Sequence, residues 1–310
     1  MLMNVYYDIV DFQPLQNAIV TSGTFDGVHL GHQKILNRLR EAAEIHGGET
    51  VVLTFWPHPR MVVSKDSQNL KLLSTLAEKI ESLRQNGVQH LVVIPFTREF
   101  SELSSEEFIQ QIVVERIGTK RLVIGYDHHF GRNREGSFEY LQQNAPRYGF
   151  EIEEIPRQEI DHLTVSSTKI RHSLMEGETN VANELLGRNY SFSGLVVKGR
   201  QLGRTIGYPT ANVQISESYK LIPVDGIYAV WVKVREQLFK GVMSIGFRPT
   251  VSGIGRTQEV YIFNFKEDIY GEKITVELVK YIRPELKFDG LDALKKAIDQ
   301  DCVDALAVLQ

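Results

Sequence analysis

Residues 23–32 read G-T-F-D-G-V-H-L-G-H, and they lie between two segments of different periodicity. Residues 18–21 form a short apolar run, whereas apolar residues at 33–39 recur at helical spacing. A strand, a glycine-rich turn and a helix in this order are typical of an α/β fold with a parallel sheet. Ligands of such sheets bind where the strands end, which is the position of this turn.

The rest of the first half repeats this alternation. Strands are predicted at 18–21, 50–55, 90–96, 121–125 and 151–155, with helical patterns at 33–39 and 72–83 and a helix start at 104–107. The sequence therefore predicts a Rossmann-like α/β domain, residues 1–186, with a parallel sheet and helices on both faces.

After residue 187 the pattern becomes that of a β domain. Strand-like segments are expected at 192–197, 226–234, 239–245, 259–265 and 273–281, followed by a final helix at 291–309. This spacing favours a small antiparallel barrel or sandwich, residues 187–310, with a C-terminal helix. The domain boundary is expected near 186–189.

Composition restricts the class of protein. The 310 residues are 42% hydrophobic and 24% charged, with a net charge of −4, so a nucleic acid is not an expected partner. A membrane is not an expected partner either. No apolar run approaches the ~18 residues of a membrane span, and no signal peptide is recognised. The single cysteine, Cys302, fits a reducing cytoplasm, where we expect the protein to be. The oligomeric state stays open.

The turn at 23–32 carries two histidines beside a helix start. If the helix begins near Gly31, His29 and His32 lie at its positive end, where backbone N–H groups favour an anion such as a triphosphate. Gly23 and Gly31 would let the backbone approach such a ligand. Surface histidines on an ordinary turn, or a partial metal site, remain alternatives.

Two later segments agree with an anion site. Residues 125–131, G-Y-D-H-H-F-G, follow the fourth predicted strand, and residues 166–171, S-S-T-K-I-R, combine hydroxyls with cations at a helix start. The second segment also has the alternative of an ordinary helix N-cap.

Residues 198–212 read K-G-R-Q-L-G-R-T-I-G-Y-P-T-A-N. Glycines permit a mobile flap, and arginines suit phosphate. Thr210 and Asn212 are two apart, so on an extended strand their oxygens face one side, as ligands suited to Mg²⁺. An edge strand after Pro209 is the alternative, and it explains only the proline.

The motifs of the first half resemble the H-x-G-H nucleotidyltransferase superfamily, and most of all the FMN adenylyltransferase domain of prokaryotic bifunctional riboflavin kinase/FAD synthetases. The resemblance implies that His29, His32 and Arg171 are catalytic. It also implies a nucleotide and flavin site formed by Gly23, Phe25, Asp26, Gly31, Ser167, Thr168, Asp127 and His128. His128 departs from the family, which commonly has phenylalanine there.

The stretch at 198–212 resembles the riboflavin kinase domain, as do S-I-G-F-R-P-T at 244–250 and the glutamate at 259. The resemblance implies that Glu259 is the catalytic base. It assigns the ATP phosphates to Lys198, Gly203 and Arg204. It assigns the flavin to Arg248, and Mg²⁺ to Thr210 and Asn212. Tyr261 and Asn264 depart from the histidine and aspartate that the family often has. A solvated strand carboxylate is the alternative for Glu259.

Together the two resemblances imply a bifunctional enzyme that converts riboflavin and ATP to FMN, and FMN and ATP to FAD and pyrophosphate. A kinase joined to a transferase for pantetheine phosphate or nicotinamide mononucleotide is a rival. A flavin-binding regulator without turnover is a rival of another class.

Overall fold

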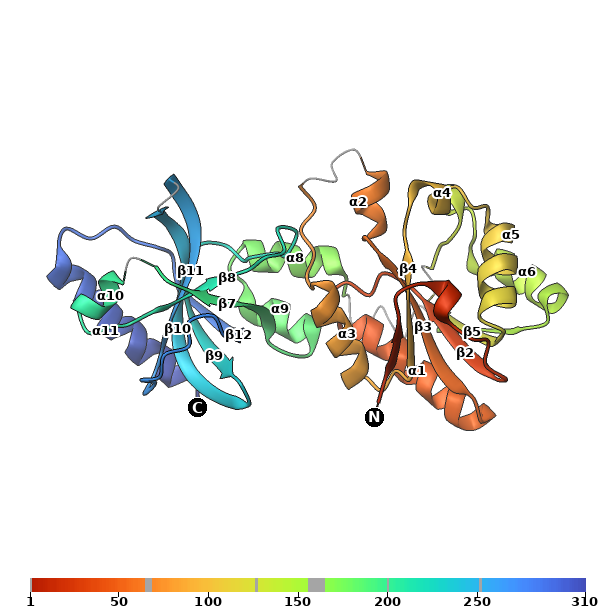
Figure 1. Cartoon of the computed structure of the whole chain (residues 1–310), viewed down its shortest axis with the longest axis horizontal. Coiled ribbons are helices and arrows are strands. Elements are labelled where there is room, and N and C mark those ends of the chain that lie inside the picture. The colour runs from red at the N-terminus through yellow and green to blue at the C-terminus, as the bar shows by residue number, and fades with distance from the viewer. Residues whose placement is uncertain (1, 65–68, 126–127, 156–164, 200, 251–252) are drawn as a thin grey trace. The chain divides into compact units, whose positions relative to one another are not determined.

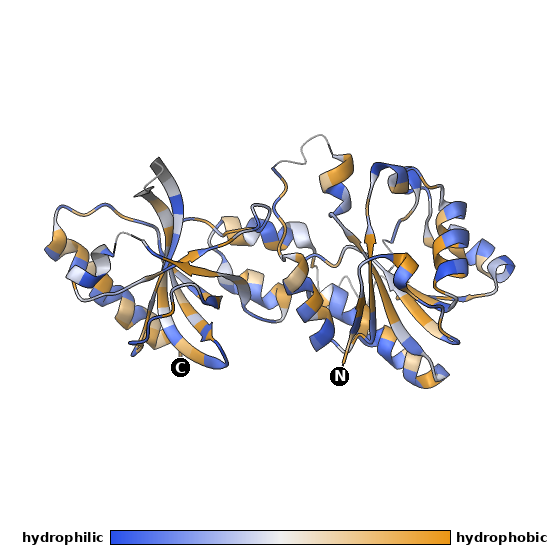
Figure 2. Ribbon diagram, in the orientation of Figure 1, coloured by the Kyte–Doolittle hydropathy of each residue, from blue (hydrophilic) through white to orange (hydrophobic). Residues whose placement is uncertain are grey.

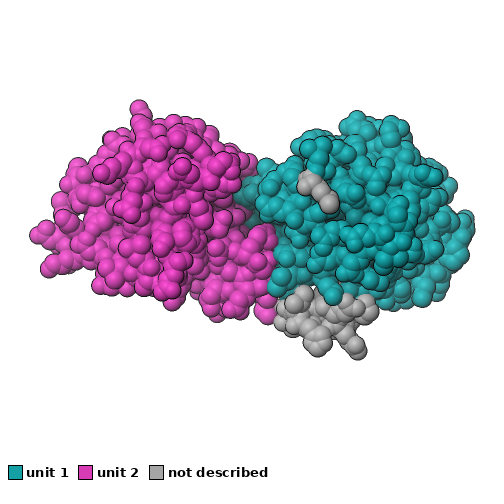
Figure 3. Space-filling model, turned by 90° about the horizontal axis from the view of Figure 1, so that it is seen from below, with its two compact units in different colours: residues 1–167 teal, residues 168–310 magenta. Residues whose placement is uncertain are grey.

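The computed structural model describes residues 2–64, 69–125, 128–155, 165–199, 201–250 and 253–310, with the backbone alone at 202, 248–250 and 253–254. The chain divides into two compact units, Met1–Ser167 and Thr168–Gln310 (Figure 3).

The first unit contains a six-stranded sheet in the order β1-β4-β3-β2-β5-β6, with every neighbouring pair parallel (Figure 1). Its strands are β1 (Asn4–Tyr6), β2 (Ala18–Ser22), β3 (Glu49–Trp56), β4 (His90–Pro95), β5 (Thr119–Gly125) and β6 (Glu151–Ile155). Five of the six were predicted from the sequence. The exception is β1, which is three residues long and gains its place by pairing with β4.

Helices cover both faces of this sheet, as predicted. Because alternate strand residues point to opposite faces, the sheet contributes to two separate cores. On one face strand residues pack with α1 (Leu30–His46) and α3 (Leu76–Gln85), and on the other with the π-helix η3 (Phe108–Arg116) and α6 (Phe138–Tyr148). Apolar residues accordingly dominate the strands in Figure 2. The shorter elements are η1 (Ile9–Asp11), α2 (Pro59–Val63), α4 (Arg98–Ser101), α5 (Ser105–Glu107) and η4 (Arg132–Arg134).

The helix expected at 72–83 begins later, at Leu76. Thr75 is its N-cap, and the Thr75 side chain and Glu78 form a capping box that fixes the first turn. Residues 72–75 therefore lie outside the helix, and the backbone N–H groups of Leu73 and Ser74 bind the Asp26 carboxylate.

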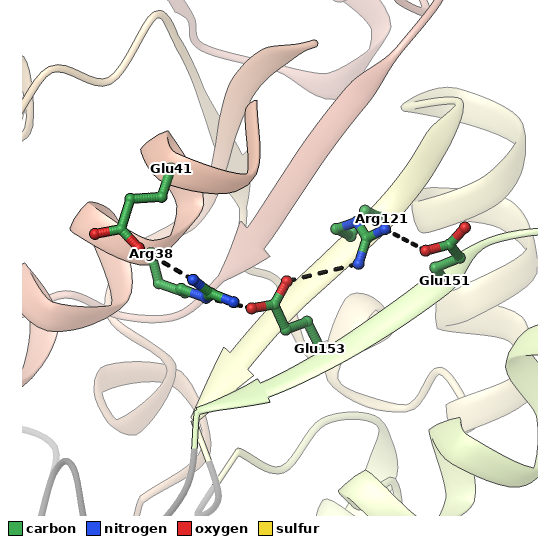
Figure 4. Close-up of polar contacts among 5 residues, drawn as sticks. All are labelled: Arg38, Glu41, Arg121, Glu151 and Glu153. Atoms are coloured by element: carbon green, nitrogen blue, oxygen red, sulfur yellow. Dashed lines mark hydrogen bonds and ion pairs between the residues drawn. The ribbon is translucent and has the colours of Figure 1, made fainter. Parts of the chain in front are cut away.

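A chain of ion pairs joins α1 to the β5–β6 edge of the sheet (Figure 4). Arg38 on α1 donates to Glu41 at 3.1 Å and also to Glu153 on β6. Arg121 on β5 contacts Glu153 at 3.6 Å and donates to Glu151. Glu153, whose side chain is 18% exposed, is thus shared between two guanidinium groups, and the pKa of Arg38 is raised by its two carboxylates, chiefly that of Glu153.

The second unit contains a closed six-stranded antiparallel barrel in the order β10-β11-β8-β7-β12-β9, as predicted (Figure 1). The strands are β7 (Tyr190–Val197), β8 (Ala211–Gln214), β9 (Gly226–Val234), β10 (Gln237–Thr250), β11 (Gly253–Ile262) and β12 (Lys273–Arg283). The strand expected at 259–265 ends at Ile262, and β10 is longer than expected at both ends. The C-terminal helix α11 (Leu291–Val308) packs Ala305 against Ile227 and Val242 of the barrel.

Two helices precede the barrel: α8 (Ser167–Met175), which begins at the last residue of the first unit, and α9 (Thr179–Leu186). Asn183 on α9 donates through Nδ2 to the carbonyl of Leu278 on β12 at 2.8 Å, and the N–H of Val224 donates to the carbonyl of Leu174 at 3.2 Å. The functional boundary expected at 186/187 thus lies after helices that pack on the barrel, and it stays a prediction.

Candidate functional sites in the two units

The first candidate site lies where the connections of the parallel sheet change direction. β2 pairs with β3 on one side and with β5 on the other, so the loops after β2 and β5 separate at the carboxyl edge. Open α/β sheets bind their ligands in the crevice between two such loops. The motif at 23–32 follows β2, and residues 125–131 follow β5.

The loop after β2 has a strained backbone, which is held by buried side chains and by hydrogen bonds to residues 73–74. Phe25 and Val28 have φ of 48° and 40°, unusual for residues other than glycine, and their side chains are buried at 2% and 0% exposure. The Asp26 carboxylate accepts hydrogen bonds from the N–H groups of Leu73 at 3.1 Å and Ser74 at 3.2 Å. These contacts stabilise a backbone conformation that would be unfavourable without them.

The two histidines form a stacked pair at the start of α1. Their ring centres are 3.6 Å apart and their planes differ by 14°. His29 is the N-cap of α1, and its Nδ1 accepts a hydrogen bond from the N–H of His32 at 3.4 Å. That bond leaves Nε2 of His29 as the nitrogen that can donate to an anion. The glycine between them is required by space, because a Cβ on Gly31 would meet the His29 ring at 3.3 Å and Val165 at 3.1 Å.

Ser167, the last residue of the first unit and part of the segment S-S-T-K-I-R, contacts this loop directly. The hydroxyl of Ser167 donates to the backbone carbonyl of Asp26 at 3.0 Å, so two motifs that are distant in sequence are adjacent in space. Thr168 and Arg171 follow on α8 in the second unit, where Thr168 is exposed and Arg171 is partly buried.

After β5, the expected flavin residue Asp127 lies outside the described residues, whereas His128 is described. Nε2 of His128 lies 3.2 Å from the hydroxyl of Ser22, and its ring stacks on Phe130 with centres 5.8 Å apart. Burial, and to a lesser extent the charges of His129 and Arg134, lower the pKa of His128 to about 4. The imidazole is therefore neutral near pH 7 and replaces an aromatic ring without adding charge.

The second candidate site lies in the barrel, where β8 meets β11. Asn212 and Glu259 are direct partners in the antiparallel register, so their side chains lie on the same face. The hydroxyl of Thr210 donates to Oε2 of Glu259 at 3.1 Å. The three predicted side chains are thereby brought together, and all three are partly buried. A Cβ on Gly199 would lie 2.4 Å from the Asn212 amide, which explains the glycine there.

Tyr270 anchors the loop that bears the predicted phosphate-binding residues. Its hydroxyl accepts hydrogen bonds from Arg204 and Gln201, each at 3.3 Å. Its ring centre lies 5.8 Å from the Lys198 ammonium and 6.0 Å from the Arg204 guanidinium, within the range of cation–π attraction. The loop contains the one-turn helix α10 (Leu202–Thr205), and Gly203 leaves no room for a side chain, since a Cβ would meet the carbonyl of Tyr208 at 2.1 Å.

Arg248, the remaining flavin prediction, lies on β10 opposite Gly255, and its side chain is outside what the structure describes.

Sequence reasoning missed Ser22 and Tyr270, which contact predicted site residues, and Lys79, a buried lysine whose ammonium interacts electrostatically with Asp26. A signal existed for Lys79 alone. It lies three residues after Leu76 and four before Leu83, on the apolar side of a predicted helix where a charge is out of place. The roles of Ser22 and Tyr270 depend on contacts between distant segments.

The described residues contain no group of three histidine, cysteine, aspartate or glutamate side chains that could hold a metal ion. None of the helices in the described ranges is both long and apolar enough to cross a bilayer. Cys302 is a free thiol, and burial, reinforced by Asp301 and Asp299, raises its pKa to about 11. The thiol is therefore protonated and unreactive near neutral pH.

Comparison with known proteins assigns both halves of the chain. A family model described as FAD synthetase matches residues 11–169, and one described as riboflavin kinase matches residues 186–309. Curated proteins named bifunctional riboflavin kinase/FMN adenylyltransferase are similar over nearly the full length. The protein from Listeria monocytogenes is 38% identical over 94% of this chain and 92% of its own, and that from Escherichia coli K12 is 38% identical over 93% and 91%.

A crystal structure described as a macrolide-efflux protein from Streptococcus pneumoniae matches 98% of both chains, with a TM-score of 0.88 and 31% identity. The same two-unit architecture is therefore present in a solved structure. By its two family models and its full-length relatives, the chain belongs to the family of bifunctional riboflavin kinase/FMN adenylyltransferases.

Proposed function

We propose that the barrel, within residues 187–310, phosphorylates riboflavin with ATP to give FMN and ADP. The α/β part, within residues 1–186, then transfers AMP from a second ATP to FMN, giving FAD and pyrophosphate. The observation that carries the proposal is that two separate clusters of predicted site residues are assembled on one chain. His29, His32 and Ser167 gather around the loop of Asp26, and Thr210 and Asn212 gather beside Glu259.

Adenylyl transfer needs no nucleophile from the protein. An oxygen of the FMN phosphate attacks the α-phosphorus of ATP, and the bond to the departing pyrophosphate breaks. Catalysis then consists of positioning and charge stabilisation. We assign the stabilisation to Nε2 of His29, to His32 and to Arg171. The triphosphate is assigned to Ser167, Thr168 and the backbone around Gly23, Phe25, Asp26 and Gly31, and the flavin to Asp127 and His128.

In the barrel, Glu259 accepts the proton of the riboflavin 5′-hydroxyl as that oxygen takes the γ-phosphoryl group. The hydrogen bond from Thr210 fixes the orientation of this carboxylate. Lys198, Gly203 and Arg204 are assigned to the ATP phosphates, and Arg248 to the flavin.

The donor set of the barrel site fits Mg²⁺. Hydroxyl, amide and carboxylate oxygens are hard ligands of the kind that magnesium prefers, and Thr210 and Asn212 would hold the ion. When bound, it would neutralise part of the phosphate charge.

We place the enzyme in the cytoplasm, with small molecules as its partners and neither nucleic acid nor membrane among them. The net charge of −4 supports the exclusion of nucleic acid. A different acceptor for the first unit is disfavoured because the barrel would supply FMN to it. A regulator without turnover is disfavoured by the intact group at Thr210, Asn212 and Glu259.

The test is to incubate the full chain with riboflavin and Mg-ATP and to separate the flavins by chromatography. Wild-type protein should yield FMN and FAD. His32→Ala should stop at FMN, with FAD formation reduced roughly 10²–10³-fold. His46→Ala, an exposed histidine at the other end of α1, serves as the matched control. Unchanged riboflavin would refute the proposal, and normal FAD formation by His32→Ala would remove this residue from it.

A further inference from the structure

A lysine is buried beneath the nucleotide loop without a hydrogen-bond acceptor. Lys79 on α3 is 1% exposed, and its ammonium has no hydrogen-bond partner among the described residues. Its Nζ lies 6.0 Å from the centre of the Trp56 ring. Burying a charge is far costlier than burying an apolar chain of the same length, so packing alone does not account for a lysine here.

The carboxylate of Asp26, which is also 1% exposed, attracts the ammonium of Lys79 electrostatically. Asp26 belongs to the loop after β2 and binds the segment that leads into α3, through the N–H groups of Leu73 and Ser74. The N–H of Gly27 donates to the Ser74 hydroxyl at 3.2 Å and adds to the same connection. The loop is therefore fastened to residues 73–74, and the ammonium is supplied by the first turns of the helix that follows.

We propose that Lys79 is a positioning residue for adenylyl transfer, whose ammonium attracts the buried Asp26 carboxylate and so keeps the loop in the shape that receives the nucleotide. The proposal rests on the function proposed for the first unit. Each oxygen of the Asp26 carboxylate accepts one backbone N–H, from Leu73 and from Ser74. In a buried site with a low effective dielectric, the attraction between an ammonium and a carboxylate is stronger than in water.

Loss of the Lys79 charge should change the position of the histidines, because the backbone connects Asp26 to His29. Phe25 and Val28 flank Asp26 and Gly27 in left-handed conformations that persist only while the surroundings enforce them. Val28 is followed by His29, the N-cap of α1. A loosened Asp26 would therefore misplace the His29 ring, although Lys79 itself touches no substrate.

The ammonium is also expected to titrate in an accessible range. Burial lowers the pKa of Lys79 from 10.5 to about 8, against the opposing effect of Asp26. The charge is present below about pH 8 and is lost above it. Arginine at this position would keep the charge throughout that range, because its own pKa is far higher.

The experiment compares full-length wild type, Lys79→Met and Lys79→Arg, with Lys120→Met as an exposed control. FAD formation from FMN and Mg-ATP, riboflavin phosphorylation and the melting temperature are measured for each. Lys79→Met should lower kcat/KM for FAD formation roughly 10–10²-fold, the range expected for a misplaced catalytic group, and should leave riboflavin phosphorylation unchanged. Lys79→Arg should retain more activity than Lys79→Met and should lack the alkaline loss of FAD formation near pH 8.

A lysine with only a structural role gives a different pattern. In that case FAD formation would follow the melting temperature, whereas we expect activity to fall in Lys79→Met while the melting temperature does not. Full FAD formation by a folded Lys79→Met would overturn the proposal. So would a loss of FAD formation near pH 8 in Lys79→Arg that equals the loss in wild type.

Calorimetric ATP affinity is the readout that does not depend on turnover. Weaker ATP binding in Lys79→Met and retained binding in Lys79→Arg support the role of Lys79, and equal affinity in all three proteins overturns it. Absence of FAD with wild-type protein would instead count against the function proposed for the first unit.

Discussion

The hydroxyl of Ser167 donates a hydrogen bond to the backbone carbonyl of Asp26 at 3.0 Å, joining two motifs at opposite ends of the first unit. One motif carries the stacked histidines and the other carries hydroxyls for a triphosphate. Since the bond ties a side chain to a backbone atom, it sets the distance between the two halves of the proposed ATP site.

Ser167→Ala should therefore weaken the adenylyl site selectively. Loss of one hydrogen bond of this kind costs about 1 kcal/mol, which corresponds to roughly a fivefold loss in kcat/KM for FAD formation. Riboflavin phosphorylation by the same protein should not change, and Ser216→Ala on the exposed surface is the control. Steady-state kinetics with FMN and ATP check this. A variant that forms FAD at the wild-type rate would show that the contact does not organise the site.

Glu259→Gln tests the barrel site. Glutamine keeps the size of the side chain and an acceptor for the Thr210 hydroxyl, but it cannot take the proton of the riboflavin hydroxyl. Loss of a general base typically costs roughly 10²–10⁴-fold, and a loose phosphoryl transfer favours the lower half of that range. FMN formation should therefore fall by about 10²–10³-fold, while FAD formation from added FMN continues. Glu236→Gln, with a side chain 94% exposed, controls for the change in charge.

Much of this organisation was predictable because it is local in sequence. The strand before Gly23 and the helix that begins with Leu30 follow from periodicity within one short stretch, and Thr210 and Asn212 follow from a spacing of two. Contacts between distant segments were not predictable. The bond between Ser167 and Asp26 depends on how the whole α/β unit folds, although each residue was singled out separately.

The same reason explains the remaining differences. The three-residue strand β1 has too short a pattern to be recognised, and it exists because β4 offers a parallel edge. Tyr270 lies in a turn far from Arg204 in sequence, and only the closed barrel brings them together.

Tyr270 offers a prediction about ATP binding in the barrel. Tyr270→Phe removes the hydroxyl that accepts from Gln201 and Arg204 but retains the ring, whereas Tyr270→Leu also removes the two cation–π contacts. The KM for ATP in riboflavin phosphorylation should rise about threefold in the first variant and about tenfold in the second. The effect on kcat should be smaller, because the loop holds phosphates and does not exchange protons. An unchanged KM in Tyr270→Leu would contradict the assignment of Lys198 and Arg204.

The helices α8 and α9 provide a test of the domain boundary. Ala182 and Leu186 are buried, and Asn183 donates to Leu278 on β12, so a fragment that starts at residue 187 leaves an apolar surface uncovered. We expect fragments 168–310 and 187–310 both to phosphorylate riboflavin. The longer one should be more stable by about 3 kcal/mol, the value of one or two buried apolar side chains. Urea unfolding of the two fragments measures the difference, and equal stability would support the boundary at 186/187.

The buried lysine beneath the nucleotide loop should also give the first unit an unusual dependence of stability on pH. In the unfolded chain Lys79 keeps its ordinary pKa of 10.5, whereas burial lowers it to about 8 in the folded chain. Between these values the unfolded chain binds more protons, so the free energy of unfolding rises with pH, by about 3 kcal/mol over the whole interval. Below pH 8 both states are protonated, and the full cost of burying the charge is present.

Lys79→Met should abolish this rise and should be at least as stable as wild type at pH 7. Trp56 contacts the ammonium, so its fluorescence in a Trp231→Phe background reports unfolding of the first unit alone. Urea unfolding at pH 7 and pH 10 then gives the change in the free energy of unfolding with pH for wild type and for Lys79→Met. Because all other titrating groups are the same in the two proteins, the difference between these changes belongs to Lys79. FAD formation is expected to fall over the same pH interval in which the free energy of unfolding rises. Opposite trends in these two pH profiles show that the charge of Lys79 supports catalysis and not folding. Identical pH slopes in Lys79→Met and wild type would contradict a lowered pKa for Lys79.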